Sequence, residues 1–283
     1  MNYIDKKSAR FSIIEHYLVF WGELRRAHLI KHFDIGTVSA SRLISAYGDV
    51  YPTNLSYNVK RKTYVYDPEL FKPAFSLEPE FALQLLSTGE TIHSVPSHTY
   101  GPKQHQQRTL NVDINACAGI TRAIVQSQSI NVVYVSATSG EKTRRLTPIS
   151  LFNGNGAWYF RAYDGHSKSF RTFKFNRVVS VDTTSTKPST RHIEEDDEWN
   201  ASVVLSLAPH TQHPNKQALA LDLGLSDKPV FNVISNSVTA GYILQELRVD
   251  CSARATLNPL EYNYQLMNYD ECKEHAFMEL APT

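Results

Sequence analysis

The sequence lacks the patterns that mark disulfide scaffolds, zinc ribbons and membrane proteins. Its 283 residues hold only three cysteines, Cys117, Cys251 and Cys272, which are widely spaced and form no C-x-x-C pair. An odd and scattered set of this kind predicts buried, reduced thiols rather than a disulfide framework. The longest apolar run, residues 13–21, is interrupted by a glutamate and a histidine and is far too short to span a bilayer. No secretory signal pattern opens the chain, so we expect a cytoplasmic protein with no membrane partner.

Sequence motifs of catalysis are also missing. There is no G-x-x-x-x-G-K-[ST] loop, G-x-S-x-G elbow, H-E-x-x-H helix or G-x-G-x-x-G turn after a strand. His210 and His213 straddle a predicted turn with no neighbouring cysteine or carboxylate in the sequence, which does not make a zinc site. The acidic run Glu194–Glu198 is typical of a solvated linker. We therefore expect neither an enzyme nor a metal protein, and no cofactor.

Charge is unevenly distributed, although the formal net charge is only +1. Residues 131–182 hold eight basic residues against three acidic ones, and residues 1–78 are weakly basic. Residues 183–283 hold seven basic residues against fourteen acidic ones. A basic front, a strongly basic middle and an acidic tail predict three units with different partners, and the first two are suited to polyanions.

The N-terminal block is predicted to be helical with a hairpin behind it. Phe11, Ile14, Leu18 and Trp21 recur at helical spacing, and Gly22 is expected either to end that helix or to bend the chain. Amphipathic patterns predict a second helix over residues 24–33 and a third over residues 37–47, separated by a three-residue turn. Residues 53–59 and 63–66 are predicted strands that flank a triply basic tip.

Two helices joined by a short turn fit a helix-turn-helix, whose second helix enters the major groove of DNA. The basic tip would then lie along phosphates or in the minor groove. The alternative is a plain three-helix bundle with a solvated hairpin. The predicted DNA-binding residues are Thr37, Ser39, Ser41, Arg42 and Ser45 of the helix, and Lys60, Arg61 and Lys62 of the hairpin.

From residue 130 the pattern changes to short strands. We predict strands over residues 131–138, 144–152, 157–164, 169–175 and 178–182, and such short, closely spaced strands favour a small barrel or a strongly bent sheet. An exposed loop is predicted at residues 97–108 and a helix at residues 114–127. A polar linker at residues 183–200 leads to a small α+β unit, with helices over 215–223 and 240–247 and strands over 202–207 and 230–234.

Strand parity predicts a polar wall in this strand-rich region. Alternate residues of a strand face opposite sides of a sheet. If each apolar face closes the core, the polar face gathers Tyr134, Ser136, Tyr159, Arg161 and Arg171. Guanidinium groups bind phosphate bidentately and aromatic rings stack on bases, so this set suits a nucleotide or a short nucleic acid. The alternative is a set of surface arginines whose stems lie over a half-exposed sheet.

The run RRLTPISLFNGNGAWYFRAYDGHSKSFRTFKFNRV, residues 144–178, resembles the core of WYL-domain regulators. In that family a proline-containing strand, a Trp-Tyr-Leu-like triplet and an arginine-rich strand ending in Arg-Ile follow in this order. Here the triplet reads WYF at residues 158–160 and the ending reads RV at residues 177–178. Further matches, in YVS at residues 134–136 and in the N-terminal run DIGTVSASRLISAYGDVYPTN, make the chain similar to the BrxR/CapW group. Members of that group are homodimeric transcriptional repressors of bacterial anti-phage defence operons.

The resemblance implies an α+β protein of several domains. These are a winged helix-turn-helix over residues 1–78, a helical linker region over 79–129, a WYL domain with a small Sm-like or SH3-like β-barrel over 130–185, and a C-terminal α+β dimerisation extension over 200–283. The implied partners are an inverted-repeat double-stranded DNA operator, a second copy of the chain, and an anionic nucleotide or oligonucleotide effector. Carried onto this sequence, the family's ligand pocket falls on Tyr134, Ser136, Arg161, Arg171 and Arg177. A different class of function stays open, namely an accessory protein that binds RNA or single-stranded DNA through the arginine-rich strands.

Overall fold

The chain divides into two compact units in a computed structural model that describes residues 6–88, 112–225 and 228–283. The first unit comprises residues 1–151 and 158–190, and the second comprises residues 152–157 and 191–283. Each unit has its own cluster of buried apolar side chains. The predicted loop at residues 97–108 lies outside the described residues.

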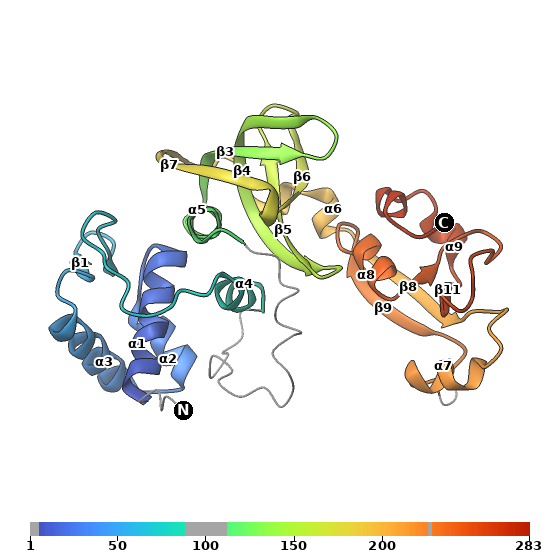
Figure 1. Cartoon of the computed structure of the whole chain (residues 1–283), viewed down its shortest axis with the longest axis horizontal. Helices are drawn as coiled ribbons and strands as arrows, with labels where there is room; N and C mark the ends of the chain where they lie inside the picture. The colour runs from blue at the N-terminus through green and yellow to red at the C-terminus, as the bar shows by residue number, and fades with distance from the viewer. Residues whose placement is uncertain (1–5, 89–111, 226–227) are drawn as a thin grey trace. The chain divides into compact units, whose positions relative to one another are not determined.

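The first unit begins with a three-helix bundle and a hairpin (Figure 1). Its elements are α1 (Lys6–His16), the π-helical turn η1 (Tyr17–Trp21), α2 (Arg26–Phe33), α3 (Thr37–Val50), β1 (Ser56–Asn58) and β2 (Thr63–Val65). β1 and β2 pair antiparallel, and Leu24 bridges to Tyr64 through two main-chain hydrogen bonds of 2.8 Å. Gly22 ends η1 with a φ of 71°, which is the first of its two predicted roles, because a left-handed C-cap favours glycine. The bundle and hairpin together form a winged helix.

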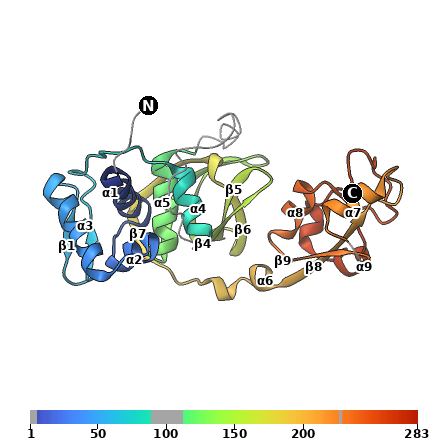
Figure 2. The same cartoon turned by 90° about the horizontal axis from the view of Figure 1, so that it is seen from below.

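Two further helices connect this bundle to a sheet. α4 (Pro79–Thr88) and α5 (Ile114–Val125) lie side by side in both views (Figures 1 and 2), and α5 packs on η1 and on strands of the sheet. The Thr121 hydroxyl donates to the Phe20 carbonyl at 2.7 Å, and the Gln126 amide donates to the Trp21 carbonyl at 3.0 Å. A helix leaves its last carbonyls without internal partners, so α5 satisfies the end of η1 and fixes the bundle against the sheet.

The sheet contains β3 (Gln128–Ser136), β4 (Gly140–Gly154), β5 (Ala157–Asp164), β6 (Ser169–Lys174) and β7 (Val178–Pro188), in the order β6-β5-β4-β3-β7. The pairings among described residues leave β6 and β7 as free edges, so the closed Sm-like or SH3-like barrel that we expected is not confirmed. The sheet is bent instead, because register shifts interrupt the β3–β7 ladder and such bulges increase the local twist. The bend brings the Tyr134 hydroxyl to the edge strand β6, where it accepts a 3.1 Å hydrogen bond from the main-chain N–H of Lys174.

The second unit is a small α+β fold. Its sheet has the order β10-β11-β8-β9, from β8 (Ser202–Pro209), β9 (Phe231–Asn236), β10 (Val249–Asp250) and β11 (Tyr264–Leu266). Its helices are α6 (Asp197–Asn200), α7 (Lys216–Asp222), α8 (Ala240–Glu246) and α9 (Tyr269–Cys272). Val203, Leu205 and Leu207 of β8 are buried with Ala240 and Leu244 of α8. Strand parity therefore divides β8 into a core face and an outer face.

The predicted helices and strands are present with shifted ends. All three cysteines are buried and free, which confirms the prediction for the thiols. The predicted linker at residues 183–200 is wrong at both ends. β7 continues to Pro188, where Lys187 and Pro188 pair with Ser129 and Gln128, and α6 occupies Asp197–Asn200. β10, β11 and α9 were not predicted, because elements of two to four residues carry no measurable periodicity. None of the described helices is long and apolar enough to cross a membrane.

Candidate nucleic-acid interface

Helix α3 turns one apolar face to the core and one polar face to solvent. Ala40, Ile44 and Tyr47 are buried. The predicted contact residues occupy the outer face, where Thr37, Ser39, Arg42 and Ser45 are exposed and Ser41 is half-buried. The helix starts after Gly36, which has no side chain to cap it, so its first N–H groups are open to a phosphate.

The turn at residues 59–62 carries the three basic residues of the hairpin, and all three are exposed. Lys62 has a φ of 52° and completes the turn, while the Arg61 N–H donates to Asn58 Oδ1 at 3.0 Å. The Arg61 guanidinium differs from the two lysines, because its Nη2 lies 2.8 Å from Glu23 Oε2. Lys60 and Lys62 therefore form the tip of the hairpin, and Arg61 is held at its base.

Two arginines near α3 were not predicted as contacts. Arg25 and Arg26 stand at the start of α2 and are exposed. Arg26 Nη1 donates to Ser41 Oγ at 3.5 Å, which places this cation beside the outer face of α3. The sequence signal for this site is the pair of adjacent arginines at the start of the second predicted helix.

The register between β5 and β6 separates the two arginines of the predicted polar wall. Arg161 lies opposite Thr172, and Arg171 lies opposite Ala162. Directly opposed residues share a face of a sheet, so Arg161 and Arg171 lie on opposite faces. The single polar wall expected from parity is wrong for this pair. It is also wrong for Tyr134, which is buried in the apolar core, while Val135 of the expected core face is exposed.

One face of this sheet carries Tyr134 and Arg171. The Tyr134 ring is buried and packs edge-on against Phe173, with ring centroids 5.1 Å apart. Arg171 is exposed, and its Nε donates to Ser169 Oγ at 3.3 Å. Ser136 lies at the end of β3 and is 3.2 Å from the Thr138 hydroxyl. These residues form the first of two candidate ligand groups.

The other group contains Tyr159, Arg161 and Arg177. Arg161 is buried, and its Nη1 donates to the Thr172 hydroxyl at 3.3 Å. The Nζ of Lys174 lies 5.8 Å from the centre of the Tyr159 ring. Burial raises the pKa of Tyr159, while the positive charge of Arg177 lowers it. This group therefore combines an aromatic ring with several cations, which is a suitable environment for a nucleotide.

Comparisons with known proteins agree with this division of the first unit. Residues 6–87 match the BrxR transcriptional regulator winged helix-turn-helix domain, and residues 115–183 match the WYL domain. The chain is a WYL-domain transcriptional regulator of the BrxR/CapW group. Over 278 residues this regulator is 28% identical to the DNA-binding transcriptional repressor CapW of Pseudomonas aeruginosa, covering 94% of this chain and 90% of that protein.

Other relatives give the same picture. The regulator is 25% identical to the DNA-binding transcriptional repressor CapW of Stenotrophomonas maltophilia, covering 95% of this chain and 91% of that protein. Among solved structures, proteasome accessory factor B/C (PafBC) of Arthrobacter aurescens is 14% identical, and the alignment covers 96% of this chain and 48% of that one. The TM-score of this alignment is 0.25.

The WYF triplet of the WYL domain has divided roles. Trp158 Nε1 donates to Glu80 Oε2 of α4 at 2.7 Å, and Phe160 is fully buried and stacks on Phe173. Tyr159, between them, faces the other side of the strand. The outer two residues of the triplet therefore hold the domain together, and the middle one lies on the opposite face with Arg161.

A buried ion pair in the WYL domain was not predicted. Arg144 Nη1 lies 2.6 Å from Asp164 Oδ2, and the His166 N–H donates to the other carboxylate oxygen at 3.0 Å. Asp164 is fully buried, and a buried carboxylate requires such partners. The two residues are 20 positions apart in the sequence, so only the strand pairing reveals that they meet. The Asp164 carboxylate neutralises the charge of Arg144, so Arg144 does not belong to the two candidate ligand groups.

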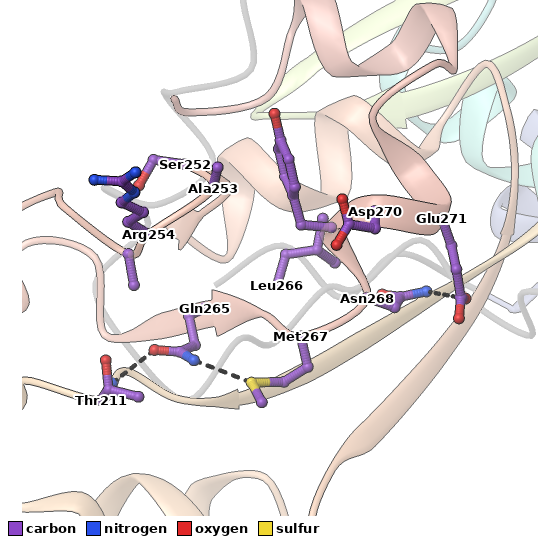
Figure 3. Close-up of a pocket in the computed structure, with 12 residues that line it drawn as sticks. Thr211, Ser252, Ala253, Arg254, Gln265, Leu266, Met267, Asn268, Asp270 and Glu271 are labelled. Atoms are coloured by element: carbon purple, nitrogen blue, oxygen red, sulfur yellow. Dashed lines mark hydrogen bonds between the residues drawn. The ribbon is translucent and has the colours of Figure 1, made fainter.

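A pocket of about 470 Å³ lies in the second unit and contains none of the predicted ligand residues (Figure 3). Residues 252–255 line one side, with Arg254 among them, and residues 265–271 line the other, with Asp270 and Glu271. The Asp250 carboxylate shapes the first side, because it accepts hydrogen bonds from Ser252 and Leu257. With charges of both signs on its walls, the pocket is less suited to a polyanion than the basic sheet.

His210 and His213 each accept a hydrogen bond from a main-chain N–H group. His210 Nε2 lies 3.1 Å from Asp250 Oδ2, with both side chains fully buried, and His210 Nδ1 accepts a hydrogen bond from the Gln212 N–H. His213 Nδ1 accepts a hydrogen bond from the Asn215 N–H. Within the described residues no group of three or more His, Cys, Asp or Glu side chains could hold a metal ion.

Proposed function

We propose that this regulator is a homodimeric DNA-binding transcriptional repressor whose WYL domain binds a nucleotide or an oligonucleotide. The observation that carries the proposal is the outer face of α3, which exposes small hydrogen-bonding side chains and Arg42 beside a basic hairpin turn. The context of a bacterial anti-phage defence operon rests on the resemblance to the BrxR/CapW group. The repressors named CapW are its relatives over most of the chain.

The proposed division of labour on DNA follows from side-chain chemistry. Arg42 and Ser39 project from the solvent face of α3, and an arginine can bind a guanine edge with two hydrogen bonds. Lys60 and Lys62 lie at the hairpin tip as point charges, which neutralise phosphate without reading sequence. Substitution of Arg42 should therefore change sequence preference, and substitution of Lys60 should not.

The test compares Arg42→Ala and Lys60→Ala on specific and random duplexes over a range of salt concentrations. Arg42→Ala should cost about 1–3 kcal/mol on the specific duplex and relax the preference for it. Lys60→Ala should weaken both duplexes alike and lower the salt slope by about one unit. Equal losses on both duplexes for both variants would contradict the proposed reading helix.

The WYL domain is proposed to sense an anion through its two basic groups. Tyr159, Arg161 and Arg177 form one group, and Tyr134, Ser136 and Arg171 form the other. A ligand changes the affinity of the dimer for DNA only if it binds two conformations of the dimer with unequal affinity. The ligand would favour the conformation in which the two winged helices no longer fit both half-sites of the operator. Titration with nucleotides and short single-stranded oligonucleotides, followed by calorimetry and by gel shift, tests both steps.

Dimerisation is proposed to use the C-terminal unit. β9 is an edge strand, and its six residues, FNVISN, carry no charge, proline or bulge to block pairing. Ile234 of β9 and Val204 of β8 are opposed and exposed on the outer face of the sheet. Two copies of an uncharged edge of this kind can pair antiparallel about a two-fold axis.

The second candidate function is an accessory protein that binds RNA or single-stranded DNA. It is favoured by the combination of aromatic and cationic side chains on the WYL sheet, which suits stacked bases. Competition between a double-stranded inverted repeat and single strands of the same sequence separates the two functions. Preference for the duplex supports the repressor, and preference for the single strand supports the accessory protein.

A further inference from the structure

A buried carboxylate lies between the start of α2 and the base of the hairpin turn. The side chain of Glu23 is 6% exposed, and each of its two oxygens lies 2.8 Å from a different guanidinium. Oε1 pairs with Arg25 Nη2, and Oε2 pairs with Arg61 Nη2. The two arginines come from separate elements, so one carboxylate joins α2 to the hairpin.

The two arginines remain largely open to solvent. Their side chains are 54% and 45% exposed, in contrast to the 6% of Glu23. A guanidinium has five N–H donors in a planar fork, and the contact with Glu23 uses one nitrogen of each. The remaining donors can bind another group without breaking the pair with Glu23.

The position of this pair is next to the proposed reading helix. Arg26 follows Arg25 directly and reaches Ser41 of α3, while Arg61 lies in the same turn as Lys60 and Lys62. In helix-turn-helix proteins, the elements that flank the reading helix lie along the DNA backbone. The groups that planar guanidinium forks meet there are phosphodiester oxygens.

We propose that Glu23 is a positioning residue that holds Arg25 and Arg61 as a two-pronged clamp for DNA backbone phosphates. This proposal rests on the proposed DNA-binding function. The phosphate site would consist of Arg61, which is one of the predicted DNA-binding residues, and Arg25, which is not. Because the arginines are held before DNA arrives, less side-chain freedom is lost on binding than with free arginines.

The proposal reverses a simple electrostatic expectation, which makes it testable. Glu23 carries a negative charge close to the DNA surface, so removing it should strengthen binding if charge alone mattered. If Glu23 orders the two arginines, Glu23→Gln should weaken binding instead. We expect a loss of roughly fivefold or more in affinity, because two long side chains must then be ordered on binding.

The experiment measures duplex affinity of the full-length protein by fluorescence anisotropy. The matched control is Glu69→Gln, which removes the same charge from an exposed position of the same winged helix. Glu69→Gln should leave affinity unchanged or slightly higher. Arg25→Lys keeps the buried carboxylate and the positive charge but loses the planar fork, and it should weaken binding without affecting folding.

A double-mutant cycle separates positioning from a general structural role. In an Arg25→Ala/Arg61→Ala background the clamp is absent, so Glu23→Gln should cause no further loss. A loss of the same size in that background overturns the clamp, and so does a Glu23→Gln variant that binds as tightly as Glu69→Gln. Either result leaves the repressor proposal standing if the wild-type protein still prefers a specific duplex. A wild-type protein that binds no duplex at all removes the repressor proposal and the clamp together.

Discussion

Buried polar side chains in the winged helix were not predicted, although their residues are plain in the sequence. Glu15 and His16 interrupt the apolar run of α1, yet both are fully buried. Glu15 accepts hydrogen bonds from the Tyr47 hydroxyl and from the main-chain N–H groups of Ala74 and Phe75. Partners 32 to 60 positions away leave no mark in local periodicity. The apolar periodicity predicted which face of α1 is buried, but it did not predict the hydrogen bonds that Glu15 makes there.

His16 provides a prediction of pH dependence at this scale. Its Nδ1 lies 2.8 Å from the Ser12 carbonyl, and its Nε2 accepts a hydrogen bond from the Glu78 N–H. These partners require the neutral ring with its proton on Nδ1, and burial lowers the pKa of His16 from 6.5. Below pH 6.5 His16 therefore binds a proton in the unfolded chain but not in the folded chain. The contribution of His16 to the free energy of unfolding is fully present above pH 6.5 and is lost as the pH falls below that value.

The measurement is thermal unfolding of wild type and His16→Gln at pH 7.5 and pH 5.5. The glutamine amide can donate and accept but does not titrate, so the wild type should lose more stability between the two pH values than the variant. Burial raises the pKa of Glu15, which acts in the opposite direction because its contribution is lost as the pH rises. That term is present in both proteins and cancels in the comparison. Equal losses in both proteins would contradict the assignment.

At the scale of elements, periodicity predicted which strands and helices exist, but not how strands face one another. Parity within β5 places Trp158 and Phe160 on one face and Tyr159 and Arg161 on the other, and Arg161 is nevertheless buried. The pairing of β6 with β5 decides whether Arg171 joins Arg161, and a shift of one residue in register reverses the answer. One sequence contains no direct information on that register. The polar wall predicted for the WYL sheet therefore consists of two separate groups of residues. The outer face of α3 depends on one helix alone, and it was predicted correctly as an exposed polar face.

The contact between α5 and β7 supports a prediction about one glycine. A Cβ atom at Gly119 would lie 2.7 Å from a methyl carbon of Val181 on β7, so Gly119→Ala must push the helix away from the sheet. We expect a loss of about 1–3 kcal/mol in the free energy of unfolding, as for other overpacked sites. Urea denaturation measures it.

The control is the same substitution in another helix. At Gly48 in α3 the nearest side-chain atom to an added Cβ is 3.7 Å away, which is ordinary contact. Gly48→Ala should therefore stabilise the protein by about 0.4–1 kcal/mol, because alanine has fewer unfolded conformations. Opposite signs for the two substitutions support the close approach of α5 to β7, and a stabilising Gly119→Ala excludes it.

At the scale of the whole molecule, the uneven charge predicted three units, whereas the chain forms two compact units. The basic first part and basic middle belong to one compact unit, and the acidic tail belongs to the other. Composition could not show that the winged helix and the WYL domain are joined, because that junction depends on hydrogen bonds from Thr121 and Gln126 of α5. Composition also does not indicate which surface of the protein contacts a second copy of the chain in a dimer. The edge of a sheet is visible only once the strand order is known.

The strand order leads to the final prediction, which concerns the homodimer. Ile234 is 76% exposed in the middle of the uncharged edge strand β9. Ile234→Lys places a charge on that edge, and natural edge strands use lysine in this way to prevent pairing. The variant should shift from dimer towards monomer in sedimentation velocity, with a dissociation constant raised roughly tenfold or more, because pairing of the two strands about a two-fold axis brings the two added charges close together. Leu260→Lys adds the same charge at another exposed apolar position of this unit and should remain dimeric.

The Ile234→Lys variant should also lose affinity for an inverted repeat while it keeps its weak affinity for a single half-site. Two linked winged helices bind with a higher effective concentration than one, and the monomer loses this advantage. A variant that stays dimeric at the same protein concentration would place the interface elsewhere.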